Sequence, residues 1–394
     1  MASRAVTLAD TFGANNYHPL PVVLARGEGE WVWDDAGNRY LDMLSAYSAL
    51  NQGHRHPRII AAMKDQLDRI TLTSRAFHNE PLGEFLAALA RISGFSRVLP
   101  MNSGAEAVET AVKAARKWAY VNKGVPVDSA EILVADGNFH GRTTTIVSFS
   151  TEEQYRMGFG PFTPGFGTVP YGDLAAIEAA ITPRTAAILL EPIQGEGGVI
   201  VPPAGYLAGV RALCSRHGIL MILDEIQTGL GRTGRMWAHQ HDGIRPDAIC
   251  VGKALGGGVY PVSAFCADDE LMGVFSPGDH GSTFGGNPLA AAAGLAALAV
   301  LEEEDLAGRA ASEGEWFMGR LRDIASPRIL EVRGRGLLIG VALRESARPV
   351  CEALMARGIL CKDTHGTVVR FAPPLVVKRE ALEWALGPIT EVLS

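Results

Sequence analysis

The chain has 394 residues, of which 47% are hydrophobic and 20% are charged, and 45 are glycine. This is the composition of a folded globular protein, so a disordered or fibrous protein is excluded. The formal net charge is −7 and neither sign forms a long run, which argues against nucleic acid or an anionic membrane as a partner and favours small molecules.

Cysteine usage and the first residues favour the cytoplasm. The five cysteines are scattered and never spaced C-x-x-C, so neither a disulfide framework nor a zinc site is expected. The first ten residues, MASRAVTLAD, lack the apolar core of a secretory signal. The longest apolar stretch, Leu289–Leu301, is too short to span a bilayer. We therefore expect a cytoplasmic protein without a membrane anchor.

Three regions are expected along the chain. Residues 1–47 contain Trp31-Val-Trp and Arg39-Tyr-Leu-Asp, which are typical of a β-meander that packs against another part of the protein. Residues 48–292 are expected to form a large domain. Residues 293–394 are expected to form a smaller one, because the pattern changes there from alternating strands and helices to short strands around one helix.

A helix is predicted to begin within the segment 101–109, Met-Asn-Ser-Gly-Ala-Glu-Ala-Val-Glu. Ser103 and Glu106 have the spacing of a capping box. Gly104 and Ala105 leave the first backbone N–H groups of the helix open to an anion, so the segment is a candidate phosphate site. A well-capped helix without a ligand is the alternative, and this motif alone does not exclude it.

Residues 98–262 alternate short apolar runs with helical stretches, which predicts a parallel sheet covered by helices on both faces. The runs are 131–135, 186–190, 219–223 and 248–251. Ligands of such sheets bind beyond the carboxyl ends of the strands. Polar or glycine-containing clusters follow the last three runs and predict the site: Glu191-Pro-Ile-Gln-Gly-Glu, Asp224-Glu-Ile-Gln and Gly252-Lys253.

Asp224 is predicted at the end of a strand, with Gln227 three residues later. A carboxylate in that position can hold a protonated ring nitrogen, because a buried aspartate without a cation opposite it would be costly. The alternative is a surface Asp-Glu pair that starts a loop.

Lys253 ends the next strand and is surrounded by alanine and glycine. Desolvation lowers the pKa of a lysine, and the neutral amine can then condense with an aldehyde. The alternative is an ordinary solvated lysine in a loop. A P-loop is excluded because no upstream glycine has Walker spacing, and Arg333-Gly-Arg-Gly-Leu-Leu-Ile-Gly lacks the downstream acidic residue of a dinucleotide site.

The C-terminal part is expected to be an α+β unit. The alanine-rich run Leu289–Leu301 is predicted to be a core helix. After it, short strands are expected at 337–343 and 368–371, around a helix at 350–357. Such a compact unit forms the smaller domain.

An anion cradle, an aspartate at a strand end and a lysine about thirty residues later suit pyridoxal 5′-phosphate, which has a phosphate, a ring nitrogen to be kept protonated and an aldehyde. The sequence resembles the class III (subgroup II) pyridoxal-phosphate-dependent aminotransferases, and most closely the ornithine aminotransferases among them. The resemblance covers nearly the whole chain and is carried by Gly13-Ala-Asn-Asn-Tyr-His-Pro-Leu-Pro, Leu72-Thr-Ser-Arg-Ala-Phe, Glu191-Pro-Ile-Gln-Gly-Glu, Asp224-Glu-Ile-Gln-Thr-Gly, Gly281-Ser-Thr-Phe-Gly-Gly-Asn-Pro and His365-Gly-Thr-Val-Val-Arg-Phe-Ala-Pro-Pro-Leu. It implies an α/β protein of fold type I, with a large domain around a mostly parallel sheet and a smaller α+β C-terminal domain.

The resemblance also implies how the cofactor is bound. Lys253 would bind it covalently and shuttle the substrate proton, and Asp224 would keep its ring nitrogen protonated. Gln227 would contact the phenolic oxygen, and Phe139 would stack on the ring unless it only fills the core. The phosphate would be held by Ser103, Gly104 and Ala105 and by Thr283 from a neighbouring subunit, so that a homodimer with shared active sites is expected.

Substrate recognition is implied for five residues. Tyr17, Tyr47 and Arg142 would hold the α-amino and α-carboxylate end of ornithine, so that the distal amine faces the cofactor. Glu196 would neutralise Arg370 in this half-reaction and release it to bind the α-carboxylate of glutamate or 2-oxoglutarate in the other. The alternatives are a static salt bridge without switching, and tyrosines that serve only in packing.

The expected activity is transfer of the δ-amino group of L-ornithine to 2-oxoglutarate, giving glutamate and glutamate 5-semialdehyde, which cyclises to pyrroline-5-carboxylate. The alternatives within the family are aminotransferases for acetylornithine, 4-aminobutyrate or lysine, which would not be expected to retain Tyr17. An alternative of another class is a non-catalytic regulatory protein that binds the cofactor. No metal is expected, because no carboxylate constellation accompanies the histidines at 54, 56, 239 and 241.

Overall fold

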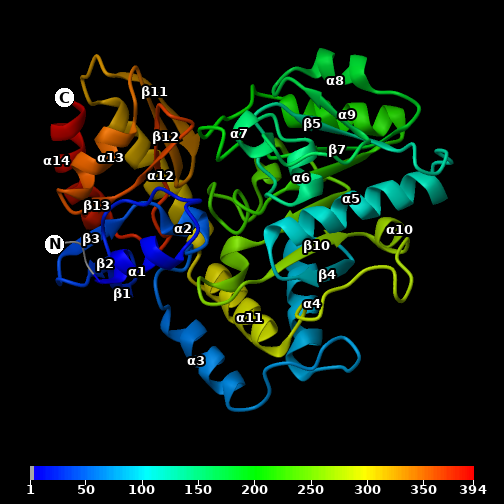
Figure 1. The fold of residues 1–394 in the computed structure, drawn as a ribbon, viewed down its shortest axis with the longest axis horizontal. Helices are drawn as coiled ribbons and strands as arrows, with labels where there is room; N and C mark the ends of the chain where they lie inside the picture. Colours follow the sequence, from blue (N-terminus) through cyan, green and yellow to red (C-terminus); the bar gives the residue numbers. More distant parts are fainter. Residues whose placement is uncertain (1–3) are drawn as a thin grey trace.

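The computed structural model describes residues 4–394, so the first three residues of the predicted N-terminal segment lie outside this range. Figure 1 shows a larger lobe around a seven-stranded sheet and a smaller lobe around a C-terminal sheet. The N-terminal strands lie beside the C-terminal helices in the smaller lobe (Figure 1). The two ends of the chain therefore build the same part of the molecule.

The sheet of the large lobe has the strand order β4-β10-β9-β8-β7-β5-β6. Its five strands from β9 to β6 run parallel, whereas β10 is antiparallel to both β9 and β4. The strands are β4 (Arg97–Met101), β10 (Ser263–Ala267), β9 (Ala248–Val251), β8 (Leu220–Asp224), β7 (Thr185–Leu190), β5 (Glu131–Ala135) and β6 (Phe166–Val169).

Successive residues of these strands face opposite helical layers. Ile132 and Cys250 pack in one hydrophobic cluster with α5 (Gly104–Val121). Their neighbours Leu133 and Val251 pack in the cluster of the other face. That face is covered by α4 (Glu80–Ser93), α9 (Tyr206–His217) and α11 (Pro288–Glu303). Burial on both faces explains why the strands are continuous apolar runs in the sequence.

Two four-stranded sheets form the smaller lobe. The first has the order β11-β12-β15-β14 and consists of β11 (Ile329–Arg335), β12 (Leu338–Leu343), β15 (Val368–Phe371) and β14 (Lys362–Thr364). The second joins the N-terminal β1 (Leu24–Glu28), β2 (Trp31–Asp34) and β3 (Arg39–Asp42) to β13 (Ile359–Leu360), which pairs with β3 in parallel. The associated helices are α12 (Leu306–Arg322), α13 (Arg348–Met355) and α14 (Arg379–Leu393).

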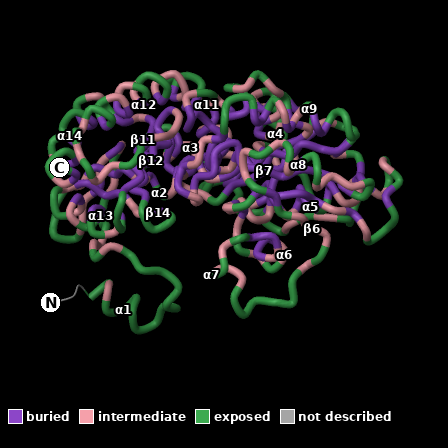
Figure 2. The backbone as a smooth tube through the Cα atoms, turned by 90° about the horizontal axis from the view of Figure 1, so that it is seen from above, coloured by how far each residue is buried: buried purple, intermediate pink, exposed green. Residues whose placement is uncertain are grey.

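The remaining elements are short or peripheral. Figure 2 shows α1 and the loops around α7 projecting from the body, with mostly exposed residues. These elements are α1 (Arg4–Phe12), α2 (Ser45–Ser48), α3 (Pro57–Leu67), α6 (Thr144–Ser148), α7 (Glu153–Arg156), α8 (Leu174–Ala180), η1 (Ala238–Asp242), η2 (Lys253–Gly256) and α10 (Asp269–Met272).

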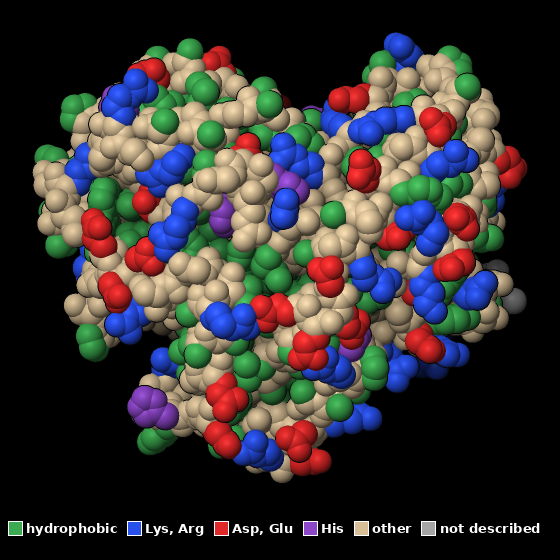
Figure 3. Space-filling view, turned by 180° about the vertical axis from the view of Figure 1, so that it is seen from behind, with side chains coloured by type: hydrophobic (Ala, Val, Ile, Leu, Met, Phe, Trp, Pro, Cys, Tyr) green, Lys and Arg blue, Asp and Glu red, His purple; other side chains and the backbone are tan. Residues whose placement is uncertain are grey.

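The predicted α/β fold class is confirmed, with the mostly parallel sheet and the C-terminal sheet in place. The boundary expected between residues 292 and 293 falls inside α11, which packs on α3 and α4, and the division into domains stays a prediction. Positive and negative side chains are interspersed over the face seen in Figure 3. Within residues 4–394, no helix is both long enough and apolar enough to cross a bilayer.

Candidate active site

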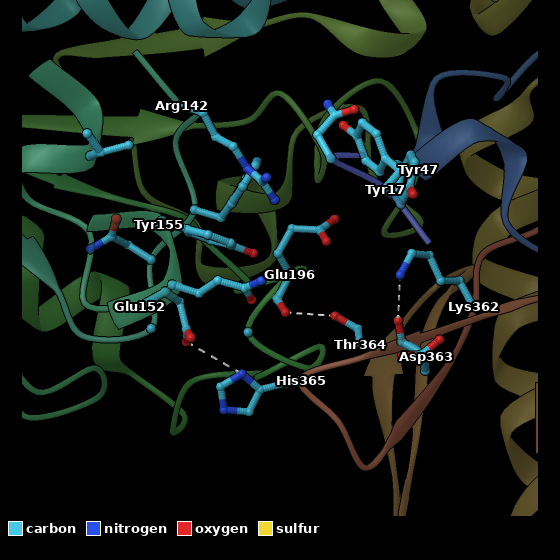
Figure 4. A pocket seen from close by; sticks show the side chains of 18 of the residues that line it. Tyr17, Tyr47, Arg142, Glu152, Tyr155, Glu196, Lys362, Asp363, Thr364 and His365 are labelled. Atoms are coloured by element: carbon cyan, nitrogen blue, oxygen red, sulfur yellow. Dashed lines mark hydrogen bonds and ion pairs between the residues drawn. The ribbon is translucent and has the colours of Figure 1, made fainter. Parts of the chain in front are cut away.

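A cavity of about 1150 Å³ lies where the N-terminal segment, the large lobe and the C-terminal sheet meet (Figure 4). Six of the predicted site residues line it: Tyr17, Tyr47, Phe139, Arg142, Glu196 and Lys253. Strand β14 and the turn after it close one side, through residues 362–366. The predicted residues come from segments far apart in the sequence, and the fold brings them into one space.

Lys253 directly follows β9 and Gly252, and it opens the short helix η2. Its backbone φ is 47°, a left-handed conformation that is uncommon for a lysine and often marks a functional position. Burial lowers the pKa of the Lys253 amine below its usual range, although the carboxylates of Glu196 and Asp224 act in the opposite direction. A larger fraction of this amine is therefore neutral than for a lysine in solvent.

Asp224 ends β8 and is 5% exposed, as a strand-end residue of a buried sheet should be. Its Oδ1 accepts a hydrogen bond from the Ile226 backbone, and its Oδ2 lies 2.7 Å from His140 Nδ1. Burial lowers the pKa of His140, but the hydrogen bond and charge of Asp224 outweigh it, so the pKa is raised. His140 is thus the side-chain partner of Asp224 in the protein, a contact that no local sequence pattern indicates.

Glu191 directly follows β7 and opens one of the three predicted clusters, although no individual role was expected for it. It is buried, and its Oε2 accepts a hydrogen bond of 2.9 Å from the Phe139 backbone N–H. Burial raises the pKa of Glu191 to about 7, against the charge of His140, which lowers it. The position directly after a buried strand was the sequence signal that could have identified this residue.

The N-terminus of α5 has the predicted capping box. Glu106 Oε2 accepts the Ser103 backbone N–H at 2.7 Å, and Ser103 Oγ accepts the Glu106 N–H at 3.3 Å. Among the described residues, the N–H groups of Gly104 and Ala105 donate to no acceptor. Gly141 packs against this end, since a Cβ at Gly141 would lie 2.9 Å from the Ala105 Cβ. The helix end is thus adjacent to the loop that carries Phe139 and Arg142.

Glu196 and Arg370 form an ion pair. Arg370 is 1% exposed and donates from Nη1 to Glu196 Oε1 at 2.6 Å. Gln227 donates to the same oxygen at 3.2 Å, and Thr364 Oγ1 donates to the Glu196 backbone carbonyl at 2.7 Å. Burial raises the pKa of Glu196, but the charges of Arg370 and Lys253 outweigh it and lower the pKa to about 2. Glu196 is therefore ionised at neutral pH.

Tyr47 lies on a strained turn, whereas Tyr17 is 68% exposed at the mouth of the cavity. The four consecutive residues Ser45, Ala46, Tyr47 and Ser48 have φ values of 46°, 48°, 61° and 70°, so α2 is a left-handed turn without a glycine. The Arg370 guanidinium carbon lies 5.3 Å from the centre of the Tyr47 ring. This turn places Tyr47 against the ion pair.

Other predicted residues lie outside the cavity lining. Asp224, Gln227 and Arg370 are buried, and neither they nor residues 103–105 are among the lining residues. Thr283 lies in the loop before α11, where its neighbour Ser282 accepts a hydrogen bond of 2.8 Å from Asn102. The histidines considered for a metal each have another partner: Asp42 for His54, Glu304 for His56, Glu225 for His239 and Thr233 for His241.

The residues present fit pyridoxal phosphate. The Gln227 Oε1 atom is buried without a hydrogen-bond partner among the described residues, and Lys253 presents an amine of lowered pKa to the cavity. Gly195 makes room for Gln227, because a Cβ at Gly195 would lie 1.5 Å from that oxygen. The open N–H groups at the start of α5 are donors for a phosphate. The chain also offers hydrogen-bond acceptors for the cofactor ring and the amine of Lys253 for its aldehyde.

Known proteins resemble this chain over nearly its whole length. A family model for class-III aminotransferases matches residues 12–393. The ornithine aminotransferase of Bacillus subtilis (strain 168) is 60% identical over 382 residues, which are 97% of this chain and 95% of that protein.

Solved structures share the fold. The ornithine aminotransferase of Toxoplasma gondii, described with partial occupancy of PLP at its active site, has a TM-score of 0.97 and 47% identity over 99% of this chain and 93% of that one. The acetylornithine aminotransferase of Elizabethkingia anophelis has a TM-score of 0.90 and 45% identity over 99% and 98%. The predicted resemblance is confirmed, and the chain belongs to the class III aminotransferases, which are pyridoxal-phosphate-dependent enzymes.

Proposed function

We propose that the protein transfers the δ-amino group of L-ornithine to 2-oxoglutarate. The proposal rests on two arginines of one site that differ in their ion pairing. Arg370 is neutralised by Glu196, while Arg142 has no ion pair within residues 4–394. One arginine is available for an amino acid carboxylate from the start, and the other becomes available only when Glu196 releases it. The names of the relatives from B. subtilis and T. gondii agree with this reaction.

The reactive centre is assigned to Lys253 and Asp224. When bound, pyridoxal phosphate supplies an aldehyde that takes up the amino group and a protonated ring that withdraws electrons from the reacting carbon. Lys253 holds the cofactor through its Nζ and afterwards moves the substrate proton as general base and acid. Asp224 holds the ring nitrogen protonated, with its other oxygen supported by His140 at 2.7 Å. Gln227 would contact the phenolic oxygen of the bound cofactor, and Phe139 would stack on its ring.

The phosphate is assigned to the helix end and to a second subunit. The open N–H groups of Gly104 and Ala105, with the Ser103 cap, suit a dianion at a helix N-terminus. We assign the remaining contact to Thr283 of the partner subunit in a cytoplasmic homodimer. Large apolar side chains that are exposed in the single chain support such an interface: Phe12, Phe77, Phe159 and Phe284.

The substrate end of the cavity is assigned to Tyr17, Tyr47 and Arg142. Arg142 binds the α-carboxylate of ornithine, and the two tyrosine hydroxyls bind its polar end, so the δ-amine reaches Lys253. Because ionised Glu196 neutralises Arg370, the carboxylate of ornithine is drawn to Arg142 and not to Arg370. In the second half-reaction, Arg370 binds the α-carboxylate of the dicarboxylate, and its unpartnered buried Nε and Nη2 supply the donors.

Acetylornithine is the second candidate substrate, because the acetylornithine aminotransferase of E. anophelis is 45% identical to this chain and the match covers 98% of that protein. A substrate panel separates the two proposals. Specificity constants for L-ornithine, N-acetylornithine, 4-aminobutyrate and L-lysine are measured with 2-oxoglutarate as acceptor. We expect ornithine to be preferred at least tenfold, since acylation removes the charged α-amine that Tyr17 and Tyr47 would bind. Equal or better turnover of another amine would reject the ornithine assignment.

A further inference from the structure

The guanidinium of Arg142 lies against two aromatic rings. Its Cζ is 4.2 Å from the centre of the Tyr155 ring and 5.7 Å from that of Phe139. The two rings are themselves in edge contact, with centres 5.9 Å apart and planes at 76°. Figure 4 shows the Arg142 side chain reaching into the cavity toward the Tyr155 ring. The Arg142 guanidinium therefore packs against the rings of Tyr155 and Phe139.

No polar contact accompanies the two ring contacts of the Arg142 guanidinium within residues 4–394. Its guanidinium forms no hydrogen bond or ion pair there, whereas Arg370 is paired with Glu196 at 2.6 Å. A cation over an aromatic face keeps its hydrogen-bond donors free, because the ring interacts with the π-faces of the guanidinium. All five N–H donors of Arg142 thus stay available for a planar anion.

Tyr155 reaches Arg142 from a separate structural element. It lies on α7, the single-turn helix whose N-cap residue Glu152 is 3.6 Å from His365 across the cavity. The Tyr155 backbone N–H is bonded to the Glu152 carbonyl at 3.1 Å. This element packs beside the cavity without contributing any of the predicted cofactor contacts.

We propose that Tyr155 is a positioning residue that holds Arg142 ready for the carboxylate of the amino acid substrate. A free arginine side chain has about 2 kcal/mol of rotamer entropy, which is lost when a ligand orders it. A ring that already fixes the side chain and the guanidinium plane removes this entropic cost from substrate binding. Tyr155 therefore sets the preference for amines that carry a carboxylate over amines that lack one. The inference rests on the proposed function, in which Arg142 receives that carboxylate.

The test compares two amines that differ only in the carboxylate, L-ornithine and 1,4-diaminobutane. The first half-reaction of the cofactor-loaded enzyme is followed by stopped-flow absorbance without 2-oxoglutarate, for the wild type, Tyr155→Leu and Tyr155→Phe. In Tyr155→Leu we expect the half-saturating ornithine concentration to rise about tenfold with a nearly unchanged limiting rate, since a positioned arginine acts in binding. The efficiency with the diamine should stay within about twofold. Tyr155→Phe keeps the ring face and should behave like the wild type.

Phe162→Leu is the matched control. It removes a neighbouring arginine–ring contact, that of Arg156 at 4.6 Å, and Phe162 does not line the cavity. Both amines should react as in the wild type. Equal losses for ornithine and diamine in Tyr155→Leu, or an unchanged half-saturating ornithine concentration, would overturn the proposal.

An unreactive probe keeps the test valid if the diamine is not turned over. Pentanoate carries only the carboxylate, and its inhibition constant against ornithine should rise about tenfold in Tyr155→Leu and stay unchanged in Tyr155→Phe. An unchanged constant in both variants would overturn the role of Tyr155. A wild type that used the diamine as well as ornithine would instead contradict the proposed function, and the pentanoate result would still decide the role of Tyr155.

Discussion

Arg370 Nη1 lies 2.6 Å from Glu196 Oε1, and both side chains belong to the candidate active site although they are 174 residues apart in sequence. The pair joins the C-terminal strand β15 to the loop after β7. Thr364 and Arg333 hold the same loop through the backbone carbonyls of Glu196 and Gly198. The smaller lobe therefore holds the backbone around Glu196 in place.

Removing the Glu196 carboxylate is expected to shift the enzyme toward dicarboxylates. In Glu196→Ala the Arg370 charge is permanently free, so it binds 2-oxoglutarate more readily and competes with Arg142 for the carboxylate of ornithine. Single-turnover rates of the two half-reactions are measured separately. We expect the ratio of ornithine to glutamate reactivity to fall about tenfold or more, which corresponds to about 1.4 kcal/mol. An unchanged ratio would show that the pair is a structural salt bridge.

Replacing His140 is expected to weaken cofactor binding. His140→Phe leaves Asp224 with only the Ile226 N–H, so the carboxylate loses its side-chain hydrogen bond and its fixed orientation. We expect the dissociation constant of pyridoxal phosphate, measured by titration of the cofactor-free protein, to rise about tenfold or more. His140→Asn can still donate to Asp224 and should lie between the wild type and the phenylalanine variant. Wild-type affinity in both variants would rule out this support.

Glu191 should make stability depend on pH. Its pKa of about 7 in the folded protein exceeds the roughly 4.3 of an unfolded glutamate. The folded state therefore keeps a proton that the unfolded chain loses, so the contribution is fully present below about pH 4 and is lost as the pH rises through about 7. Urea unfolding of the wild type and Glu191→Gln at about pH 5 and pH 8 measures this. The wild type should lose on the order of 3 kcal/mol relative to the variant over that interval. A constant difference between the two proteins would contradict the assignment.

Arg232 is expected to be a major structural residue. It is fully buried and donates to the carbonyls of Leu337 and Pro373, to Ser45 Oγ and to Asn51 Oδ1, which lie in the two end regions of the chain. Arg232→Met leaves these acceptors buried and unpaired, so the free energy of unfolding should fall by about 3–5 kcal/mol. The exposed neighbour Arg235, replaced by methionine, should change it by less than about 0.5 kcal/mol. A loss of similar size in both variants would refute the role of Arg232.

The sequence predicted the parallel strands well because they are buried on both faces. The strands β5 and β9 begin and end at the predicted residues, and β15 does so in the smaller lobe. The antiparallel β10 was not predicted, since Ser263–Ala267 contains no β-branched residue and reads as a continuation of the glycine-rich loop. Strand ends also identified Asp224 and Lys253, because the carboxyl ends of parallel strands meet at one edge.

The parts of the site that were missed depend on contacts that no local pattern encodes. His140 meets Asp224 across 84 residues, and Tyr155 meets Arg142 from a helix of one turn. The left-handed turn at Ser45–Ser48 contains no glycine, so propensity alone argues against it. Tertiary packing decides all three, which is why a sequence pattern locates strand ends more readily than side-chain partners.

In the proposed reaction, Lys253 carries pyridoxal phosphate between an amino donor and an oxo acid in this cavity. The most direct test of this role is the absorbance spectrum of the purified, cofactor-loaded protein, with L-ornithine added first and 2-oxoglutarate second. We expect ornithine to convert the spectrum to that of the aminated cofactor, 2-oxoglutarate to restore the starting spectrum, and Lys253→Ala to complete no such cycle. A wild-type spectrum that ornithine leaves unchanged, or a full cycle in Lys253→Ala, would contradict the proposed reaction.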